Sequence, residues 1–354
     1  MERTDGPDAP AIAVDGLWQV FGDGARPALS GLLKPGAATT DGVARRLKEQ
    51  GLIPAVQDAS FTVKEGELFV IMGLSGSGKS TLIRCMSRLV EPTSGSVLMA
   101  GEDILAASKR RMIELRREKL GMVFQHFGLF PHMSVIDNVA FPIKMKGVGL
   151  KERRARAMEV IELVGLGGRE DAYPRELSGG QRQRVGIARS LAVNPDVWFL
   201  DEPFSALDPL IRRQLQDEFL NIQATLRKSI VFITHDIGEA LKLADRIAIM
   251  RDGVIVQIGT PSEIVLNPVD DYVREFSRDI PKGRHMTLEA LMEPVNGAPD
   301  NGGPELRTAM TLDDALSACA LTFESMAVRD GEGKVVGLLR PEALARAVGE
   351  AQST

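Results

Sequence analysis

A short glycine-rich segment constrains this chain more than any other part of its sequence. Residues 73–81 read GLSGSGKST, and the apolar run ELFVIM directly precedes them. The segment fits G-x-x-x-x-G-K-[ST], the pattern of a phosphate-binding loop that joins a buried strand to the N-terminus of a helix. The sequence therefore predicts a nucleoside triphosphate, with magnesium, as the ligand.

The residue types of this loop suit that ligand. Glycines can adopt positive φ, so the loop can turn several N–H groups inward, and the following helix adds partial positive charge. We expect Lys79 to reach the β- and γ-phosphates, Ser80 to bind Mg2+, and Thr81 to lie near the α-phosphate. The predicted nucleotide-binding residues of the loop are Gly73, Ser75, Gly76, Ser77, Gly78, Lys79, Ser80 and Thr81.

Composition narrows the class of protein. A chain of 354 residues suits two or three domains, and 44% apolar and 26% charged residues are typical of a soluble globular protein. The net charge of −5 argues against nucleic acid as a partner, and no apolar run approaches the roughly 20 residues that span a bilayer. Residues 1–11 are acidic and Pro-rich, so we expect disorder there and no signal peptide. Two distant cysteines, Cys85 and Cys319, indicate free thiols in a reducing cytoplasm.

The order of apolar runs predicts the fold class. Short runs typical of strands alternate with helical patterns, which favours an α/β fold with a largely parallel sheet. The predicted strands cover residues 12–21, 56–63, 96–100, 122–124, 197–200, 230–233, 247–250 and 254–258. The predicted helices include residues 41–50, 109–119 and 181–192. After residue 281 the pattern changes, and residues 312–348 predict helix, strand, turn, strand and helix, as in a small accessory module.

Polar residues at the ends of three predicted strands complete a catalytic hypothesis. The strand 197–200 ends in Asp201 and Glu202; a strand-end aspartate holds the magnesium shell in phosphate-loop enzymes, and Glu202 is placed to act as the general base on a water. Gln125 also ends a strand, where its amide could contact metal and water. A lone histidine after a strand is more often structural, but beside these motifs we interpret His235 as a γ-phosphate contact.

A second anion site is predicted at residues 177–181, which read LSGGQ. Its small residues leave backbone N–H groups and the Ser178 hydroxyl available at a helix N-terminus. One nucleotide does not need two phosphate cradles in one chain. We therefore expect this site to face the nucleotide of a second copy.

Together with SALD at residues 205–208, these motifs resemble the ATP-binding cassette of ABC transporters over roughly residues 12–275. The resemblance implies an ABC ATPase domain (12–280) with a RecA-like core, an antiparallel β part and a helical subdomain at about 126–180. It also implies a head-to-tail homodimer with two ATP molecules and Mg2+ held by Ser80, Gln125 and Asp201. The residues implied to contact the partner's ATP are Ser178, Gly179, Gly180, Gln181 and Asp208.

The family also stacks adenine on an aromatic side chain near the first strand. Phe21 matches that place, and Trp18 is the alternative, with core packing as its other interpretation.

A finer resemblance comes from an insert at residues 23–55, from FVIMGLSGSGKSTLIR at 69–84, and from MVFQ at 122–125 followed by LFPH. These features are similar to the glycine betaine/proline importers, whose relatives carry choline or trimethylamine N-oxide. The resemblance implies an ATP-hydrolysing subunit that is peripheral to the cytoplasmic face of a bacterial inner membrane. It implies a separate membrane permease docking near 125–147, and a periplasmic or lipid-anchored solute-binding protein. The alternatives are an importer ATPase for another small solute, a non-transport cassette ATPase, and a regulatory nucleotide-sensing module.

The tail, residues 281–354, resembles a single CBS module, mainly in KVVGLL at residues 334–339. A packing or dimerisation appendage is the alternative interpretation. Acidic side chains rather than a cationic run characterise this segment.

Overall fold

The computed structural model describes residues 10–33, 39–125, 128–278, 280–295, 305–318 and 325–352. The chain divides into two compact units, residues 1–256 and 257–354. Most of the N-terminal segment expected to be disordered (residues 1–9) and Cys319 lie outside the described residues. Within the described part of the chain, no helix has the length and apolar character needed to cross a membrane.

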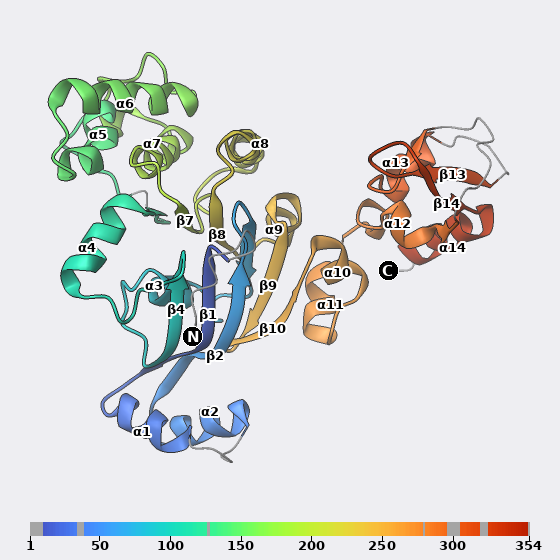
Figure 1. Cartoon of the computed structure of the whole chain (residues 1–354), viewed down its shortest axis with the longest axis horizontal. Coiled ribbons are helices and arrows are strands. Elements are labelled where there is room, and N and C mark those ends of the chain that lie inside the picture. Colours follow the sequence, from blue (N-terminus) through green and yellow to red (C-terminus); the bar gives the residue numbers. More distant parts are fainter. Residues whose placement is uncertain are drawn as a thin grey trace. The chain divides into compact units, whose positions relative to one another are not determined.

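The first unit is built around a six-stranded sheet with the strand order β10-β9-β3-β8-β7-β6 (Figure 1). The pairs β3–β8, β3–β9, β7–β8 and β6–β7 are all parallel, which confirms the predicted parallel α/β core. Because their carboxyl ends share one edge, residues that follow these strands meet there. The strands are β3 (Leu68–Met72), β6 (Leu120–Val123), β7 (Val197–Asp201), β8 (Ser229–Thr234), β9 (Arg246–Arg251) and β10 (Val254–Gly259).

Helices cover this sheet and are anchored by large side chains. Trp198 on β7 and Phe232 on β8 pack against Phe219 of α8, with ring centroids 5.5 and 6.1 Å apart. Cys85 on α3 is fully buried, and burial raises the pKa of its thiol to about 12, so it serves as a small core residue. The helices are α3 (Lys79–Met86), α4 (Lys109–Glu118), α8 (Pro209–Leu226) and α9 (Ile237–Leu243).

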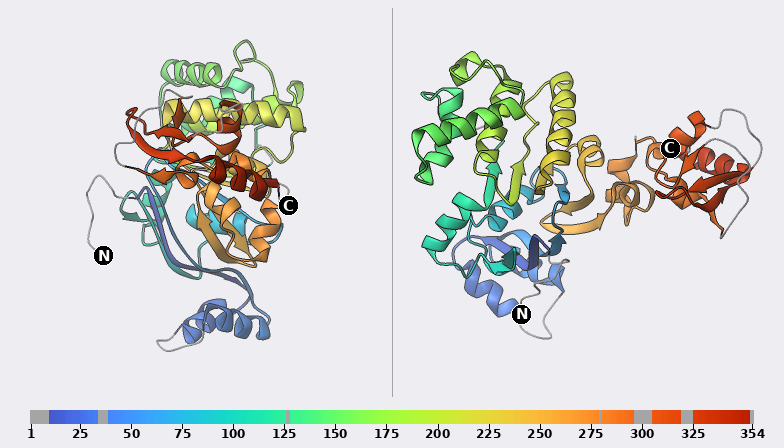
Figure 2. Two further views of the ribbon diagram at one scale, coloured as in Figure 1. Left: turned by 90° about the vertical axis from the view of Figure 1, so that its right-hand side faces the viewer. Right: turned by 45° about the horizontal axis from the view of Figure 1, so that its top comes forward.

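An antiparallel sheet with the order β2-β1-β4-β5 forms the predicted second β part. Figures 1 and 2 show two helices, α1 and α2, in blue at the end of the long β1–β2 hairpin. Trp18, buried to 1% exposure, lies in one apolar cluster with Leu29 of α1 and Leu47 of α2. The elements are β1 (Ile12–Phe21), α1 (Ala25–Leu32), α2 (Thr40–Glu49), β2 (Ile53–Val63), β4 (Ser94–Met99) and β5 (Glu102–Asp103).

A helical group follows β6 and carries the LSGGQ segment. α5 packs on both α6 and α7, and these three helices gather together in the green part of Figure 2. The buried Asn138 on α5 fixes the preceding loop, since its side chain bonds to the backbone of Phe130 and Met133. The helices are α5 (Val135–Met145), α6 (Leu150–Leu163), the short η1 (Pro174–Glu176) and α7 (Gly179–Leu191).

The second unit has its own sheet, with the order β11-β14-β13-β12, and its own core. The helix, strand, turn, strand and helix predicted from the sequence appear as α13, β13, β14 and α14. Helices α10 and α11, which we assigned to the ATPase domain, belong to this unit by their contacts. The elements are α10 (Pro261–Leu266), α11 (Asp271–Ser277), η2 (Lys282–Arg284), α12 (Leu288–Leu291), β11 (Glu293–Pro294), β12 (Leu306–Arg307), α13 (Leu312–Ala318), β13 (Met326–Arg329), β14 (Val335–Leu339) and α14 (Pro341–Gln352).

Candidate nucleotide-binding and hydrolysis site

The loop between β3 and α3 is shaped by glycines that no other residue could replace. Gly73 and Gly78 have φ of 154° and 102°. A Cβ atom on Gly73 would lie 2.2 Å from the Met250 carbonyl oxygen, and one on Gly78 would lie 2.2 Å from the Ala55 carbonyl oxygen. These two positions therefore require glycine for packing as well as for backbone conformation.

Lys79 lies inside this loop, at the first residue of α3. Its side chain is buried, and Nζ donates hydrogen bonds to the carbonyl oxygens of Gly73 (2.8 Å) and Leu74 (2.9 Å). Burial lowers the pKa of the ammonium group, while the carboxylates of Glu202 and Asp201 act in the opposite direction. The loop thus holds a cation at a helix N-terminus, where a phosphate group would be favoured.

Ser80 and Asp201 form an oxygen-rich pair beside Lys79. The Ser80 hydroxyl donates to Asp201 Oδ1 over 3.0 Å, and the Arg84 guanidinium lies 3.7 Å from Oδ2. Burial raises the pKa of the Asp201 carboxyl, and the Ser80 hydrogen bond opposes that rise. Sequence reasoning missed Arg84, although it lies four residues after Ser80 and so on the same face of α3.

This donor set suits Mg2+ that arrives with a nucleotide. Magnesium is typically held by one or two protein oxygens, with phosphates and water completing an octahedron. Among the described residues, no group of three His, Cys, Asp or Glu side chains could hold a metal ion. The Ser80 hydroxyl and the Asp201 carboxylate are two protein oxygens of the kind that Mg2+ uses.

Glu202 and His235 meet at the ends of the neighbouring strands β7 and β8. The distance between Glu202 Oε2 and His235 Nδ1 is 3.1 Å. The Glu202 backbone is left-handed, with φ of 47°, and its N–H donates to the Ile233 carbonyl over 3.1 Å. The parallel pairing of β7 and β8 thus brings together two residues that lie 33 positions apart.

Gln125 reaches the same corner from β6. Its side-chain Nε2 lies 3.5 Å from Ser205 Oγ, and the Ser205 hydroxyl donates to the Glu202 carbonyl over 3.0 Å. Ser205 was part of the SALD motif but had no individual role in the sequence interpretation. The structure shows that it joins Gln125 to the Glu202 loop.

The LSGGQ segment is not bonded to the phosphate loop of its own chain. Within the described residues, no hydrogen bond joins Ser178, Gln181 or Asp208 to residues 73–81. Asp208 is exposed and caps α8, since its Oδ1 accepts from the Ile211 N–H over 3.1 Å. The polar groups of Ser178, Gln181 and Asp208 bond instead to their own helix starts.

Two details of the LSGGQ segment differ from the sequence expectation. The Ser178 hydroxyl is not free, because it accepts from the Gln181 N–H, and Gln181 Oε1 accepts from the Ser178 N–H, which forms a capping box. The hydroxyl proton can still be donated to a phosphate. Gly180 also has a packing role: a Cβ there would lie 2.7 Å from Ile211 Cγ2.

The structure separates the two aromatic candidates for adenine. Trp18 is fully buried, as its core-packing interpretation expected, whereas Phe21 at the end of β1 is 41% exposed. Ile53 on β2 pairs with Phe21 across the sheet and is 64% exposed. Exposed apolar surface therefore flanks Phe21 on the neighbouring strand, which begins three residues before the predicted strand 56–63.

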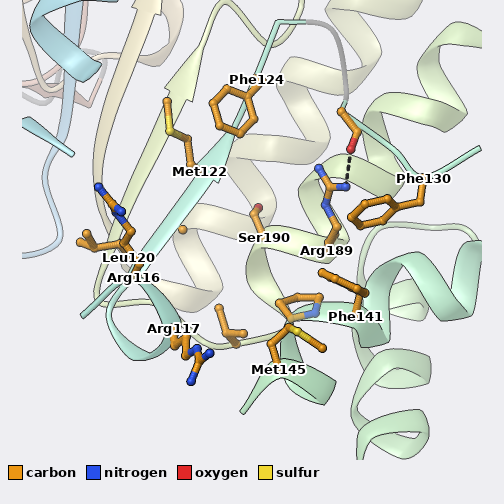
Figure 3. A pocket seen from close by; sticks show the side chains of 14 residues that line it. Arg116, Arg117, Leu120, Met122, Phe124, Phe130, Phe141, Met145, Arg189 and Ser190 are labelled. Atoms are coloured by element: carbon orange, nitrogen blue, oxygen red, sulfur yellow. Dashed lines mark hydrogen bonds between the residues drawn. The ribbon is translucent and has the colours of Figure 1, made fainter. Parts of the chain in front are cut away.

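A groove lies beside Gln125, between β6, α5 and α7 (Figure 3). Its volume is about 470 Å³. Arg189 crosses it, donates to the Gly128 carbonyl over 2.6 Å and lies over the Phe130 ring. The lining residues are Arg116, Arg117, Leu120, Gly121, Met122, Phe124, Gly128, Phe130, Phe141, Pro142, Met145, Arg189, Ser190 and Val193.

A parallel sheet, a phosphate loop, strand-end carboxylates and a capped LSGGQ helix define a cassette-type nucleotide hydrolase. The family model described as ABC transporter matches residues 56–205. The chain is 49% identical over 340 residues to the trimethylamine N-oxide transport system ATP-binding protein TmoW of Pelagibacter ubique, covering 96% of this chain and 97% of that protein. The chain belongs to the ABC transporter family, as an ATP-binding subunit.

Other relatives agree with this assignment. TmoW of Ruegeria pomeroyi is 59% identical over 276 residues (78% of this chain and 79% of that protein). The glycine betaine/proline betaine transport system ATP-binding protein ProV of Salmonella typhimurium is 50% identical over 271 residues (76% and 66%). A dimeric structure of a post-hydrolysis state of the ATP-binding cassette MJ0796, bound to ADP and Pi, aligns with a TM-score of 0.58 and 30% identity (71% and 98%). The predicted fold class and family are confirmed.

Proposed function

We propose that this chain hydrolyses ATP to energise import of a methylated amine through a separate membrane permease. Trimethylamine N-oxide is the favoured solute, and glycine betaine, proline betaine and choline are the alternatives. One observation carries the choice: the match to TmoW of Pelagibacter ubique covers 97% of that protein, whereas the match to ProV of Salmonella typhimurium covers 66%. The similarity to the trimethylamine N-oxide protein thus extends through nearly the whole chain.

In the proposed site, ATP binds the loop 73–81 with its adenine against Phe21. Lys79 moves its ammonium from the Gly73 and Leu74 carbonyls to the β- and γ-phosphates. Ser80, Asp201 and Gln125 would hold Mg2+, and the bound ion would neutralise charge on the phosphate oxygens. The loop N–H groups and the N-terminus of α3 orient the triphosphate.

Hydrolysis in this proposal depends on the corner where β7 and β8 end. Glu202 accepts a proton from the attacking water, and its 3.1 Å contact with His235 fixes the direction of the carboxylate. His235 also contacts the γ-phosphate. Gln125 is connected to the Glu202 backbone through Ser205, so a displacement of Gln125 would shift the Glu202 loop.

A second copy completes each site. The separation of the LSGGQ segment from the phosphate loop within one chain supports a head-to-tail homodimer. In that dimer the partner supplies N–H groups and the hydroxyl proton of Ser178 to the γ-phosphate, with Gly179, Gly180 and Gln181 closing over it. Asp208, exposed at the N-terminus of α8, joins the two sites across the interface. ATP thereby closes the dimer, and hydrolysis reopens it.

We propose the groove of Figure 3 as the docking place of the permease; its lining overlaps the predicted region 125–147 at Gly128, Phe130, Phe141, Pro142 and Met145. Exposed Phe124 and Met145 offer apolar surface, and Arg116 and Arg117 line the groove with positive charge. A short amphipathic helix of a membrane subunit has matching chemistry. Motion of that helix would be passed to Gln125 through its neighbour Phe124, which lines the groove. Docking on the permease would place the chain at the cytoplasmic face of the membrane.

The domain division remains part of the proposal. The ATPase domain is proposed to cover 12–280, with the helical subdomain at about 126–180 and the insert at 23–55, although residues 257–280 group by their contacts with the second compact unit. The packing of α5, α6 and α7 supports the subdomain. The tail 281–354 is proposed as a single CBS-like accessory region, supported by its order of helices and strands.

Transport in reconstituted vesicles tests the proposed function. The chain would be combined with a candidate permease and binding protein in proteoliposomes with internal ATP, and uptake of labelled trimethylamine N-oxide, glycine betaine and choline would be measured. We expect ATP-dependent uptake of trimethylamine N-oxide and none with Lys79→Ala. Absence of methylated-amine uptake, together with ATP hydrolysis stimulated by DNA or ribosomes, would overturn the proposal.

A further inference from the structure

Three polar contacts join helix α8 to helix α9. α8 begins directly after Asp208, and α9 begins directly after the residue that follows His235. The two helices thus start at two parts of the candidate site that lie on different loops. The contacts are Arg212–Asp236 (3.3 Å), Gln216–Glu239 (3.0 Å) and Asp217–Lys242 (2.7 Å).

Arg212 occupies the position nearest to the site. One terminal nitrogen of its guanidinium donates to the Leu207 carbonyl over 3.2 Å, and the other donates to Asp236 Oδ2. A single rigid group therefore connects the residue before Asp208 with the residue after His235. In the described structure its buried Nε has no hydrogen-bond partner. The two terminal hydrogen bonds are thus the contacts that orient the guanidinium.

Asp236 is itself held on both sides. Its N–H donates to Thr234 Oγ1 over 3.0 Å, and its Oδ1 caps α9 by accepting from the Glu239 N–H over 3.1 Å. His235 lies between these fixed residues and reaches Glu202 with its ring. A displacement of Asp236 therefore moves the backbone of His235.

The Gln216–Glu239 hydrogen bond strengthens the connection between α8 and α9. Gln216 and Glu239 are each 5% exposed, so their hydrogen bond is shielded from water. Hydrogen bonds in such surroundings are electrostatically stronger than in water. The contacting residues recur along both elements, at positions 212, 216 and 217 of α8 and at 236, 239 and 242 at and beyond the start of α9.

We propose that Arg212 is a positioning residue that transmits movement of the Asp208 loop to His235. When a second copy contacts Asp208, the Leu207 carbonyl shifts, and Arg212 and Asp236 carry that shift to the histidine. Hydrolysis is thereby tied to dimer closure. This inference rests on the proposed roles of Asp208, Glu202 and His235.

Arg212→Gln and Asp236→Asn in the purified full chain test the inference. Asparagine keeps the α9 cap but removes the charge that pairs with Arg212. We expect each variant to lower kcat at least about tenfold, because small misplacements of catalytic groups cost that much or more. The KM for ATP should change less than about twofold, since no phosphate contact is lost. The double variant should be no slower than either single one, because both remove the same link.

Arg110→Gln is the matched control. It removes an exposed arginine that pairs with Glu114 over 3.4 Å on α4, and it should leave kcat unchanged. Adding Arg212→Gln to Glu202→Gln should leave ATP-dependent dimers intact, which separates the link from dimer formation.

Wild-type kcat in both Arg212→Gln and Asp236→Asn would overturn the inference, as would a loss that appears only as a raised KM or adds up in the double variant. If one variant fails to fold in thermal melts, the other still decides. His235→Ala distinguishes a failure of the proposed hydrolysis site from a failure of the proposed coupling through Arg212. Full activity there would contradict the proposed site, whereas an inactive His235→Ala beside a normal Arg212→Gln would contradict only the coupling.

Discussion

At the scale of single residues, the site depends on positions that the sequence predicts by type but not by geometry. The pair Asp201 and Glu202 at the end of an apolar strand predicts metal binding and base catalysis. The left-handed backbone of Glu202, at φ of 47°, has no sequence signal, because it is imposed by the bond to Ile233 and by the turn that follows. Such a conformation costs about 1–3 kcal/mol and persists only where its surroundings hold it.

Glu202→Gln should lower the rate of ATP hydrolysis by about 10²-fold or more, because the amide cannot accept the proton of the water. ATP binding should remain, since no phosphate contact is removed. Phosphate release and equilibrium binding of labelled ATP would be measured side by side. Near-normal hydrolysis in this variant would show that another group is the base.

Phe21→Ala should raise the KM for ATP about fivefold or more, because stacking of a base on an aromatic ring is worth about 1–3 kcal/mol. Phe21→Tyr is the control and should retain wild-type KM. Trp18→Ala should instead lower the free energy of unfolding by about 3–5 kcal/mol, as a buried aromatic does. A raised KM with unchanged stability in Trp18→Ala would reverse the assignment.

At the scale of elements, strands were easier to predict than short helices. The strand 12–21 was predicted with its observed bounds, because its residues alternate in polarity and the turn segment at residues 22–24 ends it. α1 was missed: Pro27 and Gly31 are poor helix formers, and its helix forms by packing Ala25 and Leu29 in the Trp18 cluster. α7 begins two residues earlier than predicted, because the capping box starts it at Gly179.

Glu239→Gln should reduce the pH dependence of stability. Burial is the main cause that raises the pKa of this carboxyl above its ordinary value of 4.5. The folded chain then binds the proton more tightly than the unfolded chain, so this contribution is present below the ordinary pKa and is lost as pH rises through the raised one. Melting temperatures from acidic to neutral pH would be compared. We expect a smaller decline with rising pH in the variant, and parallel curves would contradict this.

At the scale of the whole molecule, the sequence motifs predict a nucleotide site that a single chain does not complete. LSGGQ and the phosphate loop together predict a shared site, and the structure keeps them unbonded within one chain. The geometry of the second copy could not be predicted from residue patterns, because it depends on how two folded surfaces meet. The preferred solute likewise comes from similarity along the full chain and not from any residue of the nucleotide site.

The mass of the Glu202→Gln chain in Mg-ATP tests the central claim that a second copy completes the site. With Mg-ATP, light scattering should give twice the 38.4 kDa of one chain; without nucleotide, it should give the mass of one chain. Adding Ser178→Arg should return the protein to the mass of one chain while it still binds ATP, because the bulky side chain blocks contact with the γ-phosphate bound by the second copy. A Glu202→Gln chain that binds ATP and stays at 38.4 kDa, or a dimer that Ser178→Arg leaves intact, would contradict the account.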